Sequence, residues 1–279
     1  MIGYLGPKGT FTHIALSHYV NVSNYQGDTK AFNSVFSLFQ ALLENQLTHI
    51  LVPVENSYGG DVYSAYEGLN NMDDSFGICY ELYLTIHQSL ISNQFCDIAD
   101  ITCLYAHEQS LRQCREFIES SMPNTQIIAC SSNAQAAIMA SKSTEVAACL
   151  GHKQLAKFYE LQVLKERVND HYNNKTRFVV ISANKTAPTG NDKTSFVCSS
   201  LKDRPGSLVD MLSELANKSI NLTRISSRPQ KQILGEYIFF IDCVGHSEDV
   251  HVKECLEKIK NQSSYYKYLG SYKEGENYD

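Results

Sequence analysis

The chain has 279 residues, of which 43% are hydrophobic and 19% are charged, and its formal net charge is −6. This composition is typical of a globular protein with room for two domains, and without a basic cluster interleaved with aromatic residues we expect no nucleic acid partner. No run approaches the roughly 20 apolar residues of a spanning helix, and the first residues lack the basic start and apolar run of a signal peptide. We therefore expect a cytoplasmic protein that binds no membrane.

Nine cysteines are scattered along the chain, mostly within apolar segments. An odd number without any C-x-x-C pair predicts reduced, buried thiols rather than a disulfide framework or a zinc site. The nine histidines show no metal-binding spacing either. We therefore expect no bound metal.

Strand-like apolar runs alternate with helical periodicity from the first residue to about residue 183. Apolar residues between Val35 and Leu43, for example, recur at the spacing of one helix face. Such alternation predicts βα units and a mainly parallel sheet. The expected strands are residues 2–5, 49–53, 78–91, 101–106, 126–130, 146–150, 162–165 and 177–182.

The run 78–91 is too long for a typical strand. It predicts a strand that passes from one sheet to another, with the chain returning near residues 161–170. We therefore expect two lobes with a cleft between them, lobe one formed by residues 1–76 and 161–183 and lobe two by residues 77–160. A single compact sheet is the alternative.

A second, smaller domain is expected after a linker at residues 184–193, which contains Pro188 and Gly190. Residues 194–279 show the order strand, helix, strand, strand, helix, strand, which is that of the ferredoxin-like fold. The expected strands are residues 195–200, 221–226, 237–244 and 265–269. Sheet edges and helix faces of this fold commonly pair with a second copy, so we expect a homo-oligomer.

Polar residues gather where the predicted strands end. Segments 6–10, 54–60 and 107–114 each follow a strand and open a helix, and segment 173–178 leads into a strand. Each segment alone has a structural explanation, as a glycine turn, a helix cap or a polar loop. Their recurrence at strand ends, where function concentrates in α/β proteins, favours a shared site.

These segments also carry a family resemblance. The motifs are Leu5-Gly6-Pro7-Lys8-Gly9-Thr10-Phe11, Pro53-Val54-Glu55-Asn56-Ser57 with Gly59, the segment 107–114, Ala147-Ala148 with Gly151, Asn174-Lys175-Thr176-Arg177-Phe178, Arg204-Pro205-Gly206-Ser207-Leu208-Val209, and the segment 221–229. With them the chain resembles a prephenate dehydratase with a C-terminal ACT regulatory domain, over nearly its whole length. The resemblance implies a two-lobed α/β catalytic domain (residues 1–183) shaped like a type II periplasmic binding protein, followed by a ferredoxin-like ACT domain (residues 194–279).

The resemblance further implies an activity and its regulation. The family converts prephenate to phenylpyruvate, with loss of water and carbon dioxide, in L-phenylalanine biosynthesis. No cofactor or metal is expected, because aromatisation supplies the driving force. L-Phenylalanine is the implied allosteric effector, acting on a homodimer or homotetramer. The implied residues are catalytic Thr176, Arg177 and Phe178; substrate-binding Thr10, Asn56, Ser57, Gln113 and Asn174; and effector-binding Gly206, Ser207, Leu208, Asn221, Leu222, Ser226 and Arg228.

The chemistry divides the catalytic roles. Because the ring carboxylate departs as carbon dioxide, a tight clamp on it would stabilise the ground state, so we expect Arg177 to bind the side-chain carboxylate that remains. A threonine hydroxyl is too weak an acid to protonate a leaving group unaided. We therefore expect Thr176 to donate a hydrogen bond to the leaving oxygen or to form one link of a proton relay. Phe178 is either the wall of a dry pocket or a plain core residue.

The chain departs from the family pattern at four positions. Ala106 and Glu108 stand where the family usually has serine and often proline, and Ser207 and Ser226 where it commonly has alanine and glutamate. These changes put one substrate contact and the strength of phenylalanine feedback in question. Two alternatives stay open: arogenate as the substrate, with an amine in place of the keto group, or a solute-binding or sensor module without catalysis.

Overall fold

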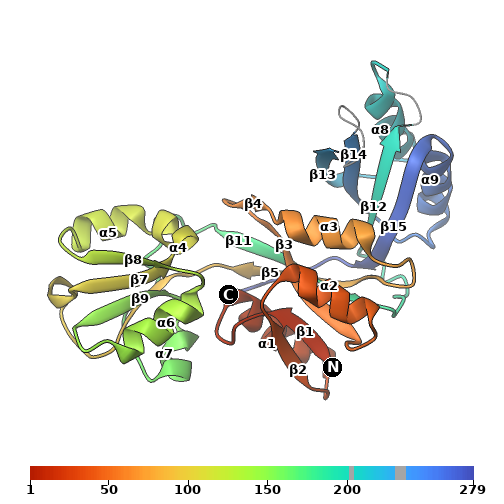
Figure 1. The fold of residues 1–279 in the computed structure, drawn as a ribbon. Coiled ribbons are helices and arrows are strands. Elements are labelled where there is room, and N and C mark those ends of the chain that lie inside the picture. The colour runs from red at the N-terminus through yellow and green to blue at the C-terminus, as the bar shows by residue number, and fades with distance from the viewer. Residues whose placement is uncertain (201–203, 230–236) are drawn as a thin grey trace.

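Three sheets organise the chain, one in each of two lobes and one in a C-terminal domain (Figure 1). The computed structural model describes residues 1–200, 204–229 and 237–279. Lobe one lies between lobe two and the C-terminal domain. Within the described ranges, the helices are all too short or too polar to cross a bilayer.

Lobe one is built on a seven-stranded mixed sheet. Its strands are β1 (Ile2–Leu5), β2 (Thr29–Phe32), β3 (His49–Asn56), β4 (Gly60–Asp61), β5 (Gly77–Thr85), β11 (Lys175–Ser182) and β16 (Glu276–Tyr278), and its helices are α1 (Phe11–Ser23), α2 (Val35–Leu43) and α3 (Tyr63–Asn71). The order is β16-β5-β11-β3-β1-β2, with β4 beside β3. Helix α1 packs on one face of the sheet, and α2 and α3 pack on the other. Strand β11 runs antiparallel to both β3 and β5.

Lobe two contains a five-stranded sheet in the order β10-β6-β9-β7-β8. These strands are β6 (Ser89–Ser92), β7 (Cys103–His107), β8 (Gln126–Cys130), β9 (Ala147–Gly151) and β10 (Gln162–Lys165), and the helices are α4 (Glu108–Gln113), α5 (Arg115–Ser121), α6 (Asn133–Lys142) and α7 (Gln154–Tyr159). Strands β9, β7 and β8 are parallel. Helices therefore follow β7, β8 and β9 at the same edge of the sheet, which faces lobe one (Figure 1).

The crossings between the lobes differ from the sequence-based expectation. The single run predicted at 78–91 is two strands, β5 in lobe one and β6 in lobe two, separated by residues 86–88. Strand β10, expected in lobe one, pairs with β6 in lobe two. The expected lobe boundaries are therefore wrong by one strand at each crossing. The reason is that β5 and β6 both bury apolar residues, so the apolar run continues through the point where the chain changes sheets.

The C-terminal domain has the expected βαββαβ order and hence the ferredoxin-like fold. Its elements are β12 (Asp192–Ser200), α8 (Ser207–Asn217), β13 (Leu222–Pro229), β14 (Tyr237–Val244), α9 (Val250–Asn261) and β15 (Ser263–Lys273). The sheet order is β13-β14-β12-β15, with both helices packed on one face. From the other face, Val197, Phe240 and Tyr272 join the same core as α2 and α3. The domain is therefore docked on lobe one through a shared hydrophobic core.

Three elements depart from the expected pattern. Strand β12 begins at Asp192, inside the expected linker, and after β15 the chain returns to lobe one, where β16 pairs with β5. Strand β2 was not predicted, because its residues are mostly exposed and carry no apolar alternation. The expected range of the second domain, 194–279, is thus wrong at both ends.

Candidate active site

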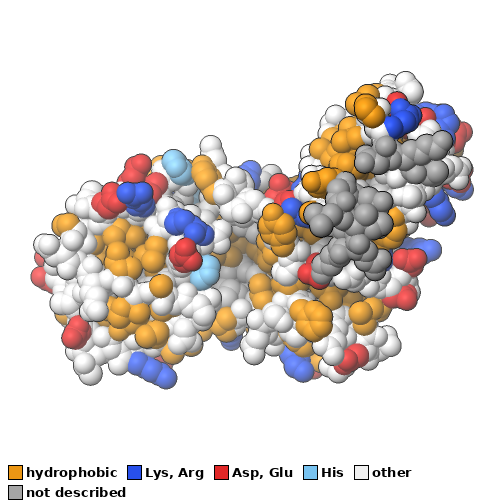
Figure 2. Space-filling view, turned by 45° about the horizontal axis from the view of Figure 1, so that its top comes forward, with side chains coloured by type: hydrophobic (Ala, Val, Ile, Leu, Met, Phe, Trp, Pro, Cys, Tyr) orange, Lys and Arg blue, Asp and Glu red, His pale blue; other side chains and the backbone are white. Residues whose placement is uncertain are grey.

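A cleft of about 540 Å³ lies between the two lobes. Its walls include residues of β3, β4, β11 and the start of α1 from lobe one, and the starts of α4 and α6 from lobe two. Figure 2 shows the hollow between the lobes, with charged and histidine side chains along its lobe-two rim. Residues from distant parts of the sequence therefore share one polar cavity.

A pair of side chains, Asn56 on β3 and Thr176 on β11, stands in direct cross-strand register at this cleft. The Asn56 amide accepts hydrogen bonds from the backbone N–H groups of Tyr58 (3.1 Å) and Gly59 (2.7 Å), which fixes its orientation. Its Nδ2 donates to Thr176 Oγ1 at 2.9 Å. Because the Thr176 hydroxyl accepts this bond, its single proton remains free to be donated to a ligand.

Two helices begin at the cleft, one from each lobe. Thr10 caps α1 by accepting from the His13 N–H (3.3 Å), and Ser132 caps α6 by accepting from the Gln135 N–H (3.0 Å). Both cap residues line the cavity. The positive ends of α1 and α6 therefore favour an anion there.

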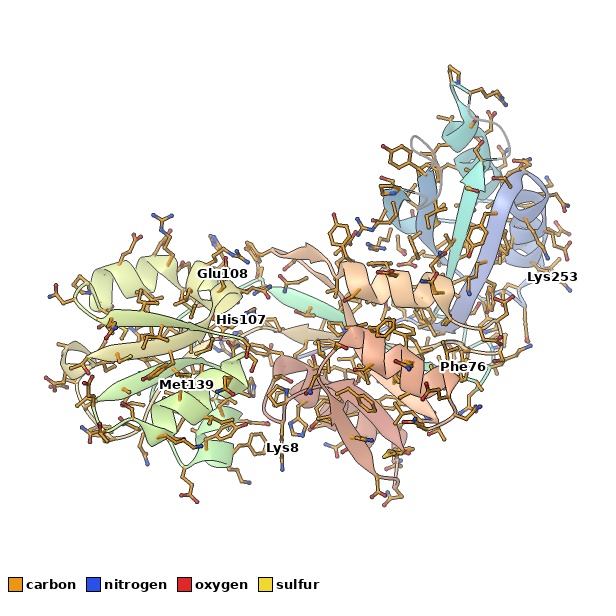
Figure 3. The ribbon with its side chains drawn as sticks, in the orientation of Figure 1. Lys8, Phe76, His107, Glu108, Met139 and Lys253 are labelled. Atoms are coloured by element: carbon orange, nitrogen blue, oxygen red, sulfur yellow. The ribbon has the colours of Figure 1, made fainter. Side chains whose placement is uncertain are left out.

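His107 ends β7 and begins α4 at the cleft (Figure 3). Its Nδ1 accepts from the Gln109 N–H at 3.3 Å, so in the neutral ring the proton is on Nε2. Burial lowers the pKa of His107 below its ordinary 6.5, and the charge of Arg112 lowers it further, against the opposing effect of Glu108. The ring is therefore neutral at pH 7 and offers a hydrogen-bond donor.

Gln113 contributes a second polar group of fixed orientation. Its Oε1 accepts a hydrogen bond from Nε2 of Gln88, a buried residue at the first crossing, at 2.9 Å. Both residues line the cleft. Because its oxygen is already bonded, the Gln113 amide presents donors to a ligand.

The structure brings most of the predicted substrate and catalytic residues together. Thr10, Asn56, Gln113, Thr176 and Phe178 line the cleft.

Ser57 and Asn174 stand behind this lining. Ser57 Oγ accepts from the Lys175 N–H at 2.9 Å, and Asn174, which is 1% exposed, accepts from Asn56 Nδ2 at 2.7 Å. Both side chains therefore hold the Asn56–Thr176 pair in place rather than line the cavity.

The prediction that Arg177 binds a substrate carboxylate is wrong. Along β11 alternate residues face opposite sides of the sheet, so Arg177 points away from the cleft that Thr176 and Phe178 line. Its guanidinium donates to Glu81 (2.6 Å), Asp242 (2.5 Å) and the Tyr272 hydroxyl (2.8 Å). Burial alone would lower the pKa of Arg177, but these neighbours raise it well above its ordinary value. The side chain is a permanently charged link to the C-terminal domain.

The predicted effector residues separate into two groups. Gly206, Ser207 and Leu208 lie at the start of α8, whereas Asn221 and Leu222 lie at the start of β13, beyond the other end of that helix.

Ser226 and Arg228, also predicted to bind the effector, contact the catalytic domain instead. Ser226 Oγ donates to Asp61 Oδ2 at 2.6 Å, and Arg228 pairs with the same carboxylate. The guanidinium of Arg228 also lies 4.0 Å from the ring centroid of Tyr63. The effector role predicted for Ser226 and Arg228 is therefore not supported, because the Ser226 hydroxyl and one guanidinium nitrogen of Arg228 are engaged by Asp61 of the catalytic domain.

Sequence reasoning missed several cleft residues. Ser132 and Asn133 stand between β8 and α6, at the kind of strand-to-helix junction that was informative elsewhere. Ser110 Oγ donates to Asn133 Oδ1 at 2.8 Å. That signal was available in the sequence. Asp61 and Gln88 carried none, because one sits on a two-residue strand and the other on a crossing.

No set of three or more His, Cys, Asp or Glu side chains within residues 1–200, 204–229 and 237–279 is grouped in a way that could hold a metal ion. The groups that the cleft lining offers to a ligand are hydrogen-bond donors, helix ends and apolar surface.

These features define a two-lobed α/β protein with a donor-rich, anion-favouring cleft, docked on a ferredoxin-like domain. A family model described as prephenate dehydratase matches residues 2–186, and one described as ACT domain matches residues 196–261. The chain belongs to the prephenate dehydratase family and carries a C-terminal ACT domain.

Individual relatives agree with this. The chain is 36% identical over 272 residues to a bifunctional chorismate mutase/prephenate dehydratase of Stutzerimonas stutzeri, covering 97% of this chain and 72% of that protein. It is 35% identical over 273 residues to a prephenate dehydratase of Methanocaldococcus jannaschii, covering 96% of each. The solved structure of an Arthrobacter aurescens prephenate dehydratase in complex with L-Phe has a TM-score of 0.89 at 29% identity, covering 98% of this chain and 90% of that one.

Proposed function

We propose that the chain converts prephenate to phenylpyruvate, releasing water and carbon dioxide, as a step of L-phenylalanine biosynthesis. The observation that carries the proposal is the Asn56–Thr176 pair, in which Asn56 orients the threonine oxygen and leaves its proton free at a cleft built for an anion. The family membership of the chain supplies the substrate class.

The reaction needs one proton and no oxidant. Prephenate enters as a dianion. The bond between the ring and its carboxylate breaks, and that carboxylate leaves as carbon dioxide. The electron pair of the broken bond completes the aromatic ring as the bond from the ring to its hydroxyl breaks, and the hydroxyl takes up one proton and departs as water. Thr176 donates a hydrogen bond to the departing oxygen, which stabilises the charge that develops there. Neutral His107 and the Gln113 amide are further donors within the same cavity, which Arg112 also lines.

The orientation of the substrate follows from which parts of the cleft favour a negatively charged carboxylate and which do not. The side-chain carboxylate, which remains in the product, binds between the positive ends of α1 and α6. The ring carboxylate lies against the apolar part of the cleft lining, formed by Pro53, Ile86 and Phe178. A dry surface does not stabilise the departing carboxylate, so the ground state is not favoured over the transition state.

Feedback by L-phenylalanine is the second part of the proposal. Helix α8 has 11 residues and is therefore about 16 Å long, so Gly206 and Ser207 at its start are remote from Asn221 and Leu222 within one chain. A second copy in the opposite orientation would bring the two segments together. Val209 on α8 and Ile225 on β13 are 64% and 40% exposed, which suits burial in a homodimer or homotetramer. The relative whose structure holds L-Phe supports this effector.

The purified chain, incubated with prephenate, tests the proposal through the ultraviolet absorbance of phenylpyruvate. We expect turnover, with kcat/KM higher for prephenate than for arogenate, and inhibition when L-phenylalanine is titrated against the initial rate. A chain that forms no phenylpyruvate at any prephenate concentration would refute the catalytic proposal. Sedimentation at several protein concentrations measures the oligomeric state independently.

A further inference from the structure

The reverse side of the catalytic strands carries charged residues that face the ACT domain. On β11 and β3, Thr176 is the cross-strand partner of Asn56, and the next pair along is Arg177 with Glu55. Because side chains alternate along a strand, the first pair faces the cleft and the second faces away from it. Arg177 and Glu55 are thus the immediate chain neighbours of Thr176 and Asn56.

The ACT sheet presents a matching pair. On β13 and β14, Arg224 is the cross-strand partner of Asp242. The ion pairs cross between the two sheets: Arg177 Nη1 lies 2.5 Å from Asp242 Oδ2, and Arg224 Nε lies 3.0 Å from Glu55 Oε2. We call Glu55, Arg177, Arg224 and Asp242 the ion-pair square.

Most of the square is removed from water. The side chains of Arg177, Asp242 and Arg224 are 6%, 8% and 11% exposed, and that of Glu55 is 39% exposed. In such surroundings charge pairs interact more strongly than on the surface, and their geometry is held by adjacent strands rather than by flexible loops. A displacement of the ACT sheet relative to lobe one therefore acts on β3 and β11 directly.

A second contact extends the square to the rim of the cleft. Arg224 and Arg228 both pair with Asp61, and Asp61 itself lines the cavity. The guanidinium of Arg224 also lies 4.6 Å from the ring centroid of Tyr66, which belongs to the shared core. Strand β13 thus holds both ends of the hairpin formed by residues 55–61, the segment that contains Asn56.

We propose that the ion-pair square transmits the state of the ACT domain to the active site, with Arg177 and Glu55 acting as positioning residues for Thr176 and Asn56. This rests on the proposed function. Effector binding at the start of β13 shifts this strand and its partner β14, the square carries the shift to β11 and β3, and the Asn56–Thr176 hydrogen bond changes its geometry. Thermodynamic reciprocity requires that a substrate bound in the cleft alter phenylalanine affinity by the same factor.

The experiment targets the more accessible of the two ion pairs in the square, Glu55–Arg224, because substitutions at the buried Arg177 threaten folding. Glu55→Gln, Arg224→Met and the double variant are prepared from the full chain, and Arg115→Met is the matched control, since Arg115 pairs with Glu119 on the exposed surface of α5 in lobe two. For each protein, phenylalanine binding is measured by calorimetry and phenylalanine inhibition by initial rates. Hydrogen exchange of residues 55–61 is followed with and without phenylalanine.

We expect Arg224→Met to bind phenylalanine but to lose inhibition, with the coupling factor falling by about fivefold or more. The double variant should lose no more than the single ones, because both remove the same link. The control should keep the full coupling factor. In the unaltered chain phenylalanine should change exchange in residues 55–61, and in Arg224→Met this response should be lost.

Two results would overturn the inference. One is full inhibition of Arg224→Met at a phenylalanine concentration that saturates this variant. The other is an unaltered chain that binds phenylalanine without any change in hydrogen exchange at residues 55–61. Failure of the proposed function is distinguishable from both. A chain without prephenate turnover refutes the catalytic proposal, yet its exchange response to phenylalanine still decides whether the square transmits.

Discussion

Replacing Arg177 by methionine should destabilise the protein severely although Arg177 touches no substrate. The side chain is 6% exposed and donates to two carboxylates and one hydroxyl. Among the buried side chains around it, two cations (Arg177 and Lys193) balance two carboxylates (Glu81 and Asp242), and Lys193 also pairs with the half-exposed Glu274. The substitution leaves this buried cluster with one negative charge in excess.

The loss falls mainly on Asp242. Glu81 keeps Lys193 at 3.1 Å and the Gly275 N–H at 2.8 Å, whereas Asp242 keeps the Ser195 hydroxyl but no ion pair among the described contacts. Removing one partner of a buried pair costs about 3–5 kcal/mol. For a chain of 279 residues, with an unfolding entropy of about 2.1 cal/mol/K per residue, that corresponds to a fall in Tm of roughly 5–9 °C.

The assay is thermal unfolding of Arg177→Met, of Arg177→Met with Asp242→Leu, and of the exposed control Arg115→Met, whose guanidinium pairs with Glu119 on the surface of α5. Because the double variant removes both charges, it should be more stable than Arg177→Met by about 1–4 kcal/mol. The control should keep the Tm of the unaltered chain. An Arg177→Met protein of unchanged Tm, or a double variant less stable than the single one, would refute the reasoning.

Three further predictions concern the cleft. Thr176→Ala should lower kcat by about 10²–10³-fold, since it removes a donor to the leaving oxygen, whereas Thr176→Ser should keep much of the rate; an alanine variant with near-normal kcat would contradict the assignment. Asn56→Asp should lower kcat/KM for prephenate by about 10²-fold, which steady-state kinetics checks. The new carboxylate accepts the hydrogen bond of the Thr176 hydroxyl, which then cannot donate to the substrate, and it repels a dianion. Burial holds the pKa of His107 below its ordinary value, so the neutral ring is the form present at pH 7; as pH falls through the lowered pKa, Nδ1 gains a proton and can no longer accept from the Gln109 N–H, so the ring loses its fixed orientation at the cleft. A pH profile of kcat/KM should therefore be flat above about pH 6.5 and fall below it, and His107→Gln should abolish the falling limb.

The sequence predicted the cleft better than it predicted the orientation of individual side chains. Strand-end motifs placed Thr10, Asn56 and Gln113 in one cavity because the carboxyl ends of parallel strands meet at the same edge of a sheet. Thr176 joins them because β11 is antiparallel to β3 and begins at that edge. The two-residue period of a strand already implied that Arg177 could not share a face with both Thr176 and Phe178. The three residues therefore do not form one catalytic unit.

The partners of Arg177 could not be predicted from local patterns. Glu81 and Asp242 lie 96 and 65 residues away, and they meet Arg177 only because the ACT domain docks on lobe one. The same holds for Asp61, whose hairpin carries no periodic signal. Burial alone would raise the pKa of Asp61, but the Ser226 hydrogen bond and the charges of Arg224 and Arg228 outweigh it and lower that pKa. This carboxylate thus stays ionised at the rim of an anion site, neutralised from the other domain.

The position of Arg177 agrees with what decarboxylation requires of the cleft. A site that releases carbon dioxide gains nothing from a strong cation beside the departing carboxylate. On β11 the guanidinium faces the ACT domain, and the helix ends of α1 and α6 supply a weaker positive field, which falls off within one turn. Such a field holds the carboxylate that stays without stabilising the one that leaves. The Thr-Arg-Phe segment therefore serves two surfaces at once: Thr176 and Phe178 shape the cleft, and Arg177 ties their strand to the domain that we propose senses the product.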